Sequence, residues 1–283
     1  MAIRTFIIAL SIYCMVSLEG MVKKDFIIPS AMDAVPVRLY SLCNSGKQNT
    51  NKIVIFIHGG GWTMGTLDLY DDFCTIVCKH LKIPILSVSY RLAPVNKFPA
   101  AVNDVVTVCK WCCLKYGKVV LCGDSSGGNL CLSACIKLRH NKLFRSKLFA
   151  QVLFYPFIDN NFTLPSFRMF DDEKFLSTKK MIKYIQDYTG FFYLDASIKD
   201  NFLIYPAMYK ELHVFPPTLI ISAEFDILLD SHLLWAKKMR QAGRHISLKI
   251  IKNSHHGFIT FPLHNKAFID KSLQIIGEWL KHL

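Results

Sequence analysis

The stretch Lys118 to Leu130 reads K-V-V-L-C-G-D-S-S-G-G-N-L and decides the fold class of this chain. A β-type apolar run ends abruptly at Gly123, and helix-forming sequence follows the glycines after the serine pair. A strand that passes through G-x-S-x-G directly into a helix forces the central serine onto a strained turn, which only glycines can flank closely. The pattern predicts an exposed hydroxyl on Ser125 and makes this residue the candidate nucleophile.

Strands and helices alternate on both sides of this turn. Apolar runs such as I-V-I-F-I at Ile53 to Ile57 are uninterrupted, as expected for strands that are buried on both faces. The alternation predicts an α/β fold, with a mostly parallel central sheet and helices on both faces, over a single domain at 23–283. The expected strands are Val35 to Leu42, Lys52 to Ile57, Pro84 to Tyr90, Lys118 to Cys122, Phe149 to Tyr155, Pro217 to Ser222 and Ile246 to Lys252.

The helices expected between these strands leave one irregular segment, at about 160–207. This segment holds a predicted helix at Thr178 to Thr189 and the aromatic run Phe191 to Tyr193. An insertion between two sheet strands usually becomes a lid, so we expect a small helical cap here. The other expected helices are Leu67 to Leu81, Pro99 to Lys115, Ser126 to Asn141, Ser231 to Ala242 and Lys266 to His282.

The charge and cysteine patterns narrow the partners and cofactors. The net charge of +13 comes from scattered basic residues without a run of five, so we predict no nucleic-acid partner. Cys74 and Cys78 lie four residues apart in an apolar helical pattern, which is typical of buried free thiols, as is the pair Cys131 and Cys135. The C-x-x-C at Cys109 to Cys112 lacks a second Cys/His pair at a zinc-like distance, so we predict no metal site.

Residues 1–22 form an apolar N-terminal segment whose role stays open. The run from Thr5 to Leu18 is uncharged, follows Arg4 and ends at Glu19. It matches the apolar part of a signal peptide and is shorter than an ordinary membrane span. A signal peptide, a short uncleaved membrane anchor and an apolar helix over the functional site of a soluble protein all fit. If this run acts as a signal or an anchor, the protein is secretory or membrane-associated, and otherwise it is cytoplasmic. The oligomeric state stays open.

A second motif, His58-Gly59-Gly60-Gly61-Trp62, directly follows an expected strand. Three consecutive glycines let the backbone turn its N–H groups toward a ligand without steric conflict. Binding a negative charge that develops on a carbonyl oxygen requires such N–H groups. The motif predicts an oxyanion hole next to the serine.

Acyl transfer through a serine also needs a base and a carboxylate that orients the base. In this architecture the acid and then the histidine follow the serine along the chain. Glu224, Asp226 and Asp230 lie after one late strand, and His255 and His256 lie after the next. Position favours Asp226, because Asp230 is placed to begin a helix as its N-cap. Both histidines remain possible bases at this point.

Five ordered motifs resemble those of the hormone-sensitive-lipase-type esterases of the α/β-hydrolase fold, over about Phe26 to Leu283. They are H-G-G-G-W, S-Y-R-L-A-P from Ser89, G-D-S-S-G-G, A-E-F-D-I-L and H-G-F. In that family the acid is the Asp two residues after the Glu, and the base is the His directly before Gly-Phe. The resemblance therefore implies Asp226 as the acid and His256 as the base.

The resemblance also implies the oxyanion donors. They would be the N–H groups of Gly59, Gly60 and Gly61 and that of the residue after the nucleophile, Ser126. The family usually has Ala at this last position. Because only the backbone N–H would be used, we expect the serine in place of alanine to be harmless.

The function implied is a serine hydrolase that cleaves small carboxylic esters of short to medium acyl chains, with no metal or organic cofactor. Two alternatives are an amide hydrolase similar to arylacetamide deacetylases and a ligand receptor. Plant gibberellin receptors resemble the family but lack its catalytic histidine, whereas His256 is present in this chain. The motif set therefore favours catalysis over ligand reception.

Overall fold

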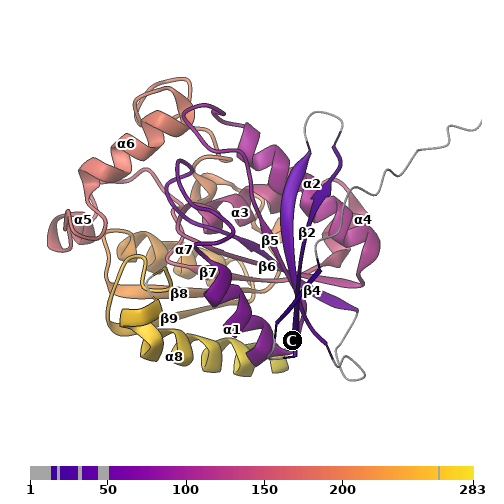
Figure 1. Cartoon of the computed structure of the whole chain (residues 1–283). Helices are drawn as coiled ribbons and strands as arrows, with labels where there is room; N and C mark the ends of the chain where they lie inside the picture. Colours follow the sequence, from indigo (N-terminus) through magenta and orange to yellow (C-terminus); the bar gives the residue numbers. More distant parts are fainter. Residues whose placement is uncertain (1–13, 18–19, 31–33, 44–50, 261) are drawn as a thin grey trace, which may run out of the picture.

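A central sheet runs through the part of the chain that this computed structural model describes, residues 14–17, 20–30, 34–43, 51–260 and 262–283 (Figure 1). Within these residues it has nine strands in the order β1-β2-β3-β5-β4-β6-β7-β8-β9. The strands from β4 to β9 pair in parallel, whereas β1, β2 and β3 add an antiparallel edge. The prediction of a mostly parallel sheet is confirmed. The strands are β1 (Cys14–Ser17), β2 (Met21–Ile28), β3 (Val35–Leu42), β4 (Lys52–Ile57), β5 (Ile85–Val88), β6 (Lys118–Asp124), β7 (Leu148–Phe154), β8 (Thr218–Phe225) and β9 (Ile246–His255).

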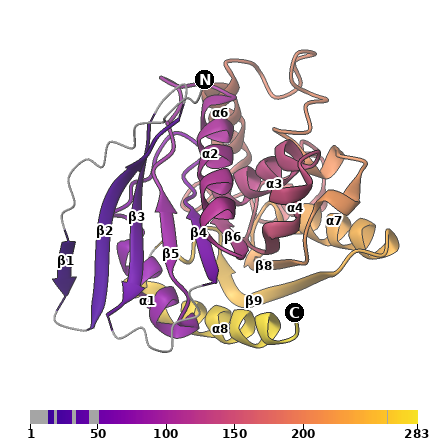
Figure 2. The ribbon, with the colours of Figure 1, turned by 90° about the vertical axis from the view of Figure 1, so that its right-hand side faces the viewer.

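Helices cover both faces of the sheet (Figure 2). α1 (Asp71–Leu81) and α8 (Pro262–Lys281) pack against each other on one face. The opposite face carries α2 (Ala100–Lys115), α3 (Ser126–Leu138), α4 (Lys142–Lys147) and α7 (Leu229–Gln241). Two further helices, α5 (Pro165–Met169) and α6 (Thr178–Thr189), and short 3₁₀ turns at Pro206–Met208 and Leu212–Val214 lie between β7 and β8.

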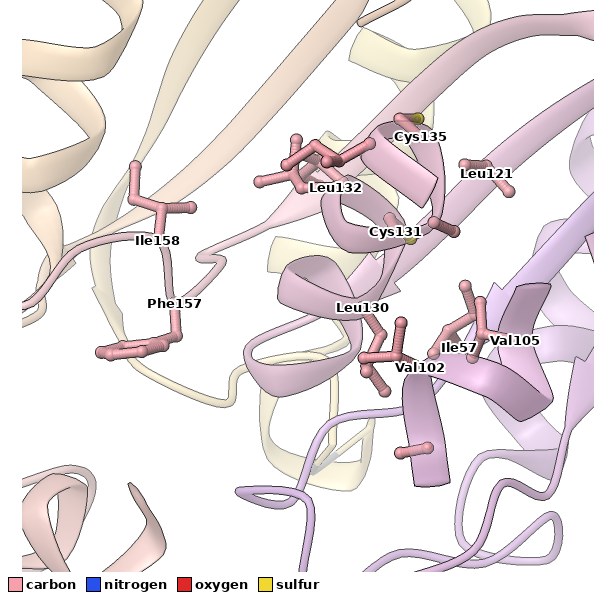
Figure 3. Close-up of a cluster of buried hydrophobic side chains, with 14 of the residues drawn as sticks. Ile57, Val102, Val105, Leu121, Leu130, Cys131, Leu132, Cys135, Phe157 and Ile158 are labelled. Carbon is pink, nitrogen blue, oxygen red and sulfur yellow. The ribbon is translucent and has the colours of Figure 1, made fainter. Parts of the chain in front are cut away.

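The apolar runs of the strands divide their side chains between two cores. Ile55 and Ile57 of β4 belong to the core on the α2 and α3 side, whereas Val54 and Phe56 belong to the core beneath α1 and α8. Figure 3 shows the first core, where Ile57 lies near Val102 and Leu130. Successive strand residues point to opposite faces, so a strand that is covered on both faces must be apolar throughout.

Most boundaries lie close to the expected ones. β3, β4 and α6 have the predicted bounds. The helix predicted from Leu67 begins instead at Asp71, because residues 67–70 form a turn in which Tyr70 lacks helical geometry. Asp71 and Asp72 then occupy the first helical turn, where the helix dipole favours negative charge.

The N-terminal strands were not predicted. β2 has the sequence M-V-K-K-D-F-I-I, and its charged centre is half-exposed near the sheet edge, so it lacks a continuous apolar run. Of the run Thr5 to Leu18, the structure describes only Cys14–Ser17, which pairs with β2 as an extended strand. For these four residues the helical interpretation is wrong. Thr5 to Tyr13 and Leu18 lie outside the described residues, as do the signal and anchor interpretations that rest on them.

The cysteines behave as their helical spacing predicts. Cys74 and Cys78 of α1 are buried and free, and so are Cys131 and Cys135 of α3. The thiols of Cys109, Cys112 and Cys113 are also buried and free. Within the described ranges, no group of three or more His, Cys, Asp or Glu side chains is arranged to hold a metal ion.

Candidate active site

Ser125 stands at the sharp turn between β6 and α3. Its φ of 50° and ψ of −117° lie in a region that side chains with a Cβ rarely adopt. The Ser125 N–H donates to the carbonyl of Phe154, at 2.9 Å, and so ties the turn to β7. The sheet and the helix together hold the strained turn, which leaves the serine partly exposed at the carboxyl edge of the strands.

The two flanking glycines are required by close backbone approach. A Cβ on Gly123 would lie 2.7 Å from the carbonyl carbon of Gly127. A Cβ on Gly127 would lie 2.0 Å from the carbonyl oxygen of Ile57, at the end of β4. No side chain fits at such distances, so the glycines let the elbow pack directly against the neighbouring strand.

Replacing Gly127 by Ala is expected to lower the free energy of unfolding by at least about 2 kcal/mol, because the added methyl group meets the β4 backbone. Urea denaturation measures this change. Gly277→Ala in α8 is the matched control, since its nearest neighbour is a side-chain nitrogen of His80 at 3.5 Å. Because Gly277 lies in a helix interior, its replacement by Ala should raise the free energy of unfolding by about 0.5–1 kcal/mol. Equal effects at the two positions would contradict the packing argument.

His256 connects the serine to a buried carboxylate. Its Nε2 lies 2.9 Å from Ser125 Oγ, and its Nδ1 lies 2.7 Å from Asp226 Oδ2. With Nδ1 protonated, His256 donates to Asp226 and its Nε2 accepts the hydroxyl proton of Ser125. The Asp226 side chain is fully buried and also accepts the N–H of Leu228, at 3.0 Å. The structure thus brings together the serine, base and acid that the resemblance implied, from the ends of β6, β8 and β9.

The other candidate acids and the other histidine are engaged elsewhere. Glu224 accepts from Lys252 Nζ at 2.6 Å and from the Asn253 N–H at 2.7 Å. Asp230 accepts the N–H of Ser166, at 2.8 Å, and lies in the first turn of α7. Its prediction as an N-cap is wrong, because α7 already begins at Leu229.

His255 belongs to an aromatic cluster beside the triad. It stacks on Phe175, with ring centroids 3.9 Å apart, and also contacts Phe225. Phe225 and His255 line a cleft of about 450 Å³ together with Met169, Phe170, Asp171 and Asp172. Phe225 directly precedes Asp226, and His255 directly precedes His256. The cleft therefore adjoins the loops that carry Asp226 and His256.

The glycine loop after β4 has an unusual backbone. Gly60, Gly61 and Trp62 all have positive φ values, of 108°, 58° and 61°. In the described part of the chain, the N–H groups of Gly60, Gly61 and Ser126 have no hydrogen-bond acceptor, which leaves them available to a ligand. Gly59 differs, because its N–H donates to Asp124 Oδ1 at 2.7 Å. This engaged N–H corrects the expectation that Gly59 is an oxyanion donor.

The histidine of the H-G-G-G motif is structural. His58 is fully buried, and burial lowers its pKa to about 4, so the ring is neutral near pH 7. It stacks on Tyr90, with ring centroids 4.3 Å apart. Its Nδ1 lies 2.8 Å from the carbonyl of Gly59. His58 thus packs against the loop as a buried, neutral side chain.

Asp124, which directly precedes Ser125, contacts the candidate site, although the sequence argument did not single it out. It accepts the N–H of Gly59 through Oδ1 and the hydroxyl of Tyr70 through Oδ2, at 3.1 Å. Burial raises the pKa of this carboxyl to about 7, against the lowering effect of both hydrogen bonds. Asp124 therefore joins the elbow to the glycine loop.

Replacing Asp124 by Asn is expected to change how stability depends on pH. The folded-state pKa of Asp124 lies above the usual 3.8, so the folded protein holds this proton more tightly and loses stability as pH rises from about 4 to about 7. Asn cannot ionise, so the variant should gain stability relative to the native chain, by a few kcal/mol, over that interval. Urea unfolding at about pH 5 and pH 8 tests this difference. A relative loss for the variant would mean that the fold favours the ionised carboxyl.

The helix α6 lies over the glycine loop. A Cβ on Gly61 would lie 2.4 Å from the ring of Tyr184, so this ring packs directly on the glycine. Trp62 stacks on Tyr188, with ring centroids 4.5 Å apart and planes 3° from parallel. The N–H of Phe98 donates to the carbonyl of Tyr188, at 2.8 Å. These contacts attach α6 above the candidate oxyanion hole.

The parallel sheet and the nucleophile elbow define the α/β hydrolase fold. The chain belongs to the Abhydrolase_3 family of that fold, whose model matches residues 54–260. The resemblance to hormone-sensitive-lipase-type esterases is therefore confirmed. Among the residues described above, no helix combines the length and the apolar character needed to span a bilayer.

Named relatives are similar over most of the chain. "Carboxylic ester hydrolase LipN" of Mycobacterium tuberculosis is 32% identical over 83% of this chain, which spans 64% of the length of LipN. "Arylacetamide deacetylase" of Bos taurus is 24% identical over 86% of this chain and 76% of its own length. A Pyrobaculum calidifontis esterase structure is 26% identical, with a TM-score of 0.80 over 91% of this chain and 86% of the esterase.

Proposed function

We propose that this protein is a carboxylic ester hydrolase that works through an acyl-enzyme on Ser125. The hydrogen-bonded series from Ser125 to His256 to Asp226 carries this proposal. Such a series supplies a nucleophile, a general base and a group that orients the base. The names of several relatives, among them LipN, point to the same substrate class.

In the proposed first half-reaction, Ser125 Oγ attacks the acyl carbon while its proton moves to His256 Nε2. The carbonyl electron pair moves onto the oxygen, and the N–H groups of Gly60, Gly61 and Ser126 stabilise that charge. When the carbonyl re-forms, the bond to the alcohol oxygen breaks and His256 donates its proton to the leaving alcohol.

Hydrolysis of the acyl-enzyme repeats these steps with water as the nucleophile. His256 takes a proton from the water, and the second tetrahedral intermediate breaks its bond to Ser125 Oγ. The serine recovers its proton from His256, and the carboxylic acid leaves. Asp226 holds the Nδ1 proton of His256 in place throughout.

The proposal extends to short and medium acyl chains. The Tyr184 ring lies on Gly61, and the stacked Trp62 and Tyr188 rings fill the adjacent space. We infer that this aromatic roof, as part of a cap insertion at about 160–207, limits the length of acyl group that the site accepts.

A fluorophosphonate and a series of p-nitrophenyl esters test the proposed function. We expect covalent labelling at Ser125 and a kcat/KM that declines for long acyl chains. A matched anilide separates ester from amide hydrolysis, which uses the same groups but must protonate an amine leaving group. Unlabelled Ser125 together with no ester turnover would contradict the proposal. Faster turnover of the anilide would instead favour an amide hydrolase.

A further inference from the structure

The hydroxyl of Ser126 joins the nucleophile elbow to the glycine loop. Ser126 is buried, and its Oγ accepts the N–H of Trp62, at 3.2 Å. The neighbouring phenol of Tyr90 donates to the carbonyl of His58, at 2.9 Å. Ser126 thereby holds the loop at Trp62, and Tyr90 holds it at His58.

The placement of this loop matters for the proposed chemistry because the oxyanion donors come from two separate parts of the chain. Gly60 and Gly61 follow β4, whereas the Ser126 N–H lies at the start of α3. Hydrogen-bond donors stabilise a transition state best when they are already in place, since moving them costs free energy during the reaction. A loop of glycines loses much conformational entropy on being ordered, so external contacts must hold it.

Asp124 and Ser126, the two residues beside Ser125, accept the N–H groups that flank those of Gly60 and Gly61 along the loop. Asp124 accepts the N–H of Gly59, before Gly60 and Gly61, at 2.7 Å. Ser126 accepts the N–H of Trp62, after them. The serine at this position, which was expected to be harmless, thus adds a contact to Trp62 that an alanine would lack.

We propose that Ser126 is a positioning residue of the oxyanion hole. Its hydroxyl fixes the position of the Gly60 and Gly61 N–H groups relative to the N–H of Ser126. This inference rests on the proposed function. It assigns to Ser126 two separable contributions. The backbone N–H binds the oxyanion, and the side chain holds the opposing donors in place.

Ser133 provides a matched control on the same helix. It is buried like Ser126, and its hydroxyl bonds the carbonyls of Asn129 and Leu203, at 3.1 Å and 2.7 Å. Neither partner belongs to the glycine loop. Ser133→Ala therefore removes a buried serine hydroxyl without touching the oxyanion donors.

The test compares Ser126→Ala and Ser133→Ala with p-nitrophenyl acetate and with a fluorophosphonate. We expect Ser126→Ala to lower kcat by roughly 3- to 10-fold, as for one neutral hydrogen bond, with KM within about 2-fold of the native value. The rate of Ser125 phosphonylation should fall by the same factor, because the phosphonyl oxygen uses the same donors. Both rates are expressed per active site, counted by titration with the fluorophosphonate, so that unfolded protein does not lower them. Ser133→Ala should leave both rates unchanged.

Tyr90→Phe tests the contact at the other end of the loop, where the Tyr90 phenol donates to the carbonyl of His58. It should also lower kcat, and the double variant with Ser126→Ala should lose less than the product of the two single losses, because both changes release the same loop. Both changes leave the contact between His256 and Asp226 intact.

The outcomes separate this inference from the proposed function. A native protein that neither turns over esters nor labels at Ser125 overturns the proposed function. An active native protein with Ser126→Ala rates equal to those of Ser133→Ala overturns the positioning role alone. A Ser126→Ala variant that loses only thermal stability, with an unchanged kcat, also overturns the positioning role and leaves the proposed function standing.

Discussion

Replacing Ser125 by Ala is expected to lower the rate of ester hydrolysis by about 10⁴-fold or more while the fold stays intact. The serine is partly exposed, and its Oγ lies 2.9 Å from His256 Nε2, where the nucleophile must be. Steady-state kinetics with a p-nitrophenyl ester measures the loss, and circular dichroism checks the fold. A variant that retained native turnover would exclude Ser125 as the nucleophile.

A second substitution at the same position separates chemistry from backbone strain. Gly adopts the φ of 50° and ψ of −117° of Ser125 without a Cβ conflict. We therefore expect Ser125→Gly to be as inactive as Ser125→Ala but more stable, by about 1 kcal/mol in urea unfolding. Equal stabilities would mean that the elbow carries no strain at this residue.

Replacing Asp226 by Asn is expected to lower kcat by about 10⁴-fold, because it reverses the proton positions on His256. One oxygen of Asp226 accepts the N–H of Leu228, at 3.0 Å, so the amide oxygen of Asn must keep that role. The amide nitrogen then faces His256 Nδ1, which must accept rather than donate. Nε2 would carry the proton and could no longer accept the hydroxyl proton of Ser125.

Asp230→Asn is the control for this change. Asp230 lies four residues further along and accepts the N–H of Ser166 rather than touching a histidine. We expect its kcat to stay within about 2-fold of the native value. If the two Asn variants lost activity equally, the acid would not be distinguished by its contact with His256, and the role given to Asp226 would be wrong.

The sequence predicted the sheet strands on which the site is built because their composition reports burial directly. Strands covered on both faces, such as Ile53 to Ile57, need apolar side chains at every position, and this leaves an unmistakable run. β2 was not predicted for the same reason. It lies near the edge of the sheet and is half-exposed, and Lys23, Lys24 and Asp25 interrupt its apolar run. The N-terminal helical interpretation failed at Cys14–Ser17 because an apolar run does not by itself distinguish a helix from a strand.

Side-chain contacts at the site were less predictable. Motif order placed an acid and a base at the right edge of the sheet, and only the resemblance chose between His255 and His256. The distances then show which side chain reaches Ser125 and which stacks on Phe175. Neighbouring residues in a sequence can point in opposite directions, so a one-residue difference decides between a proton acceptor and a packing residue.

The sequence by itself determined that a serine sits on a glycine-flanked elbow between a strand and a helix, because the local backbone conformation leaves no other choice of residues. The tertiary structure decided what surrounds that serine. The Gly59 N–H is engaged by Asp124, and the Ser126 hydroxyl holds Trp62. Both contacts join residues more than sixty positions apart, and only the packing of β4 against β6 brings them within hydrogen-bond distance.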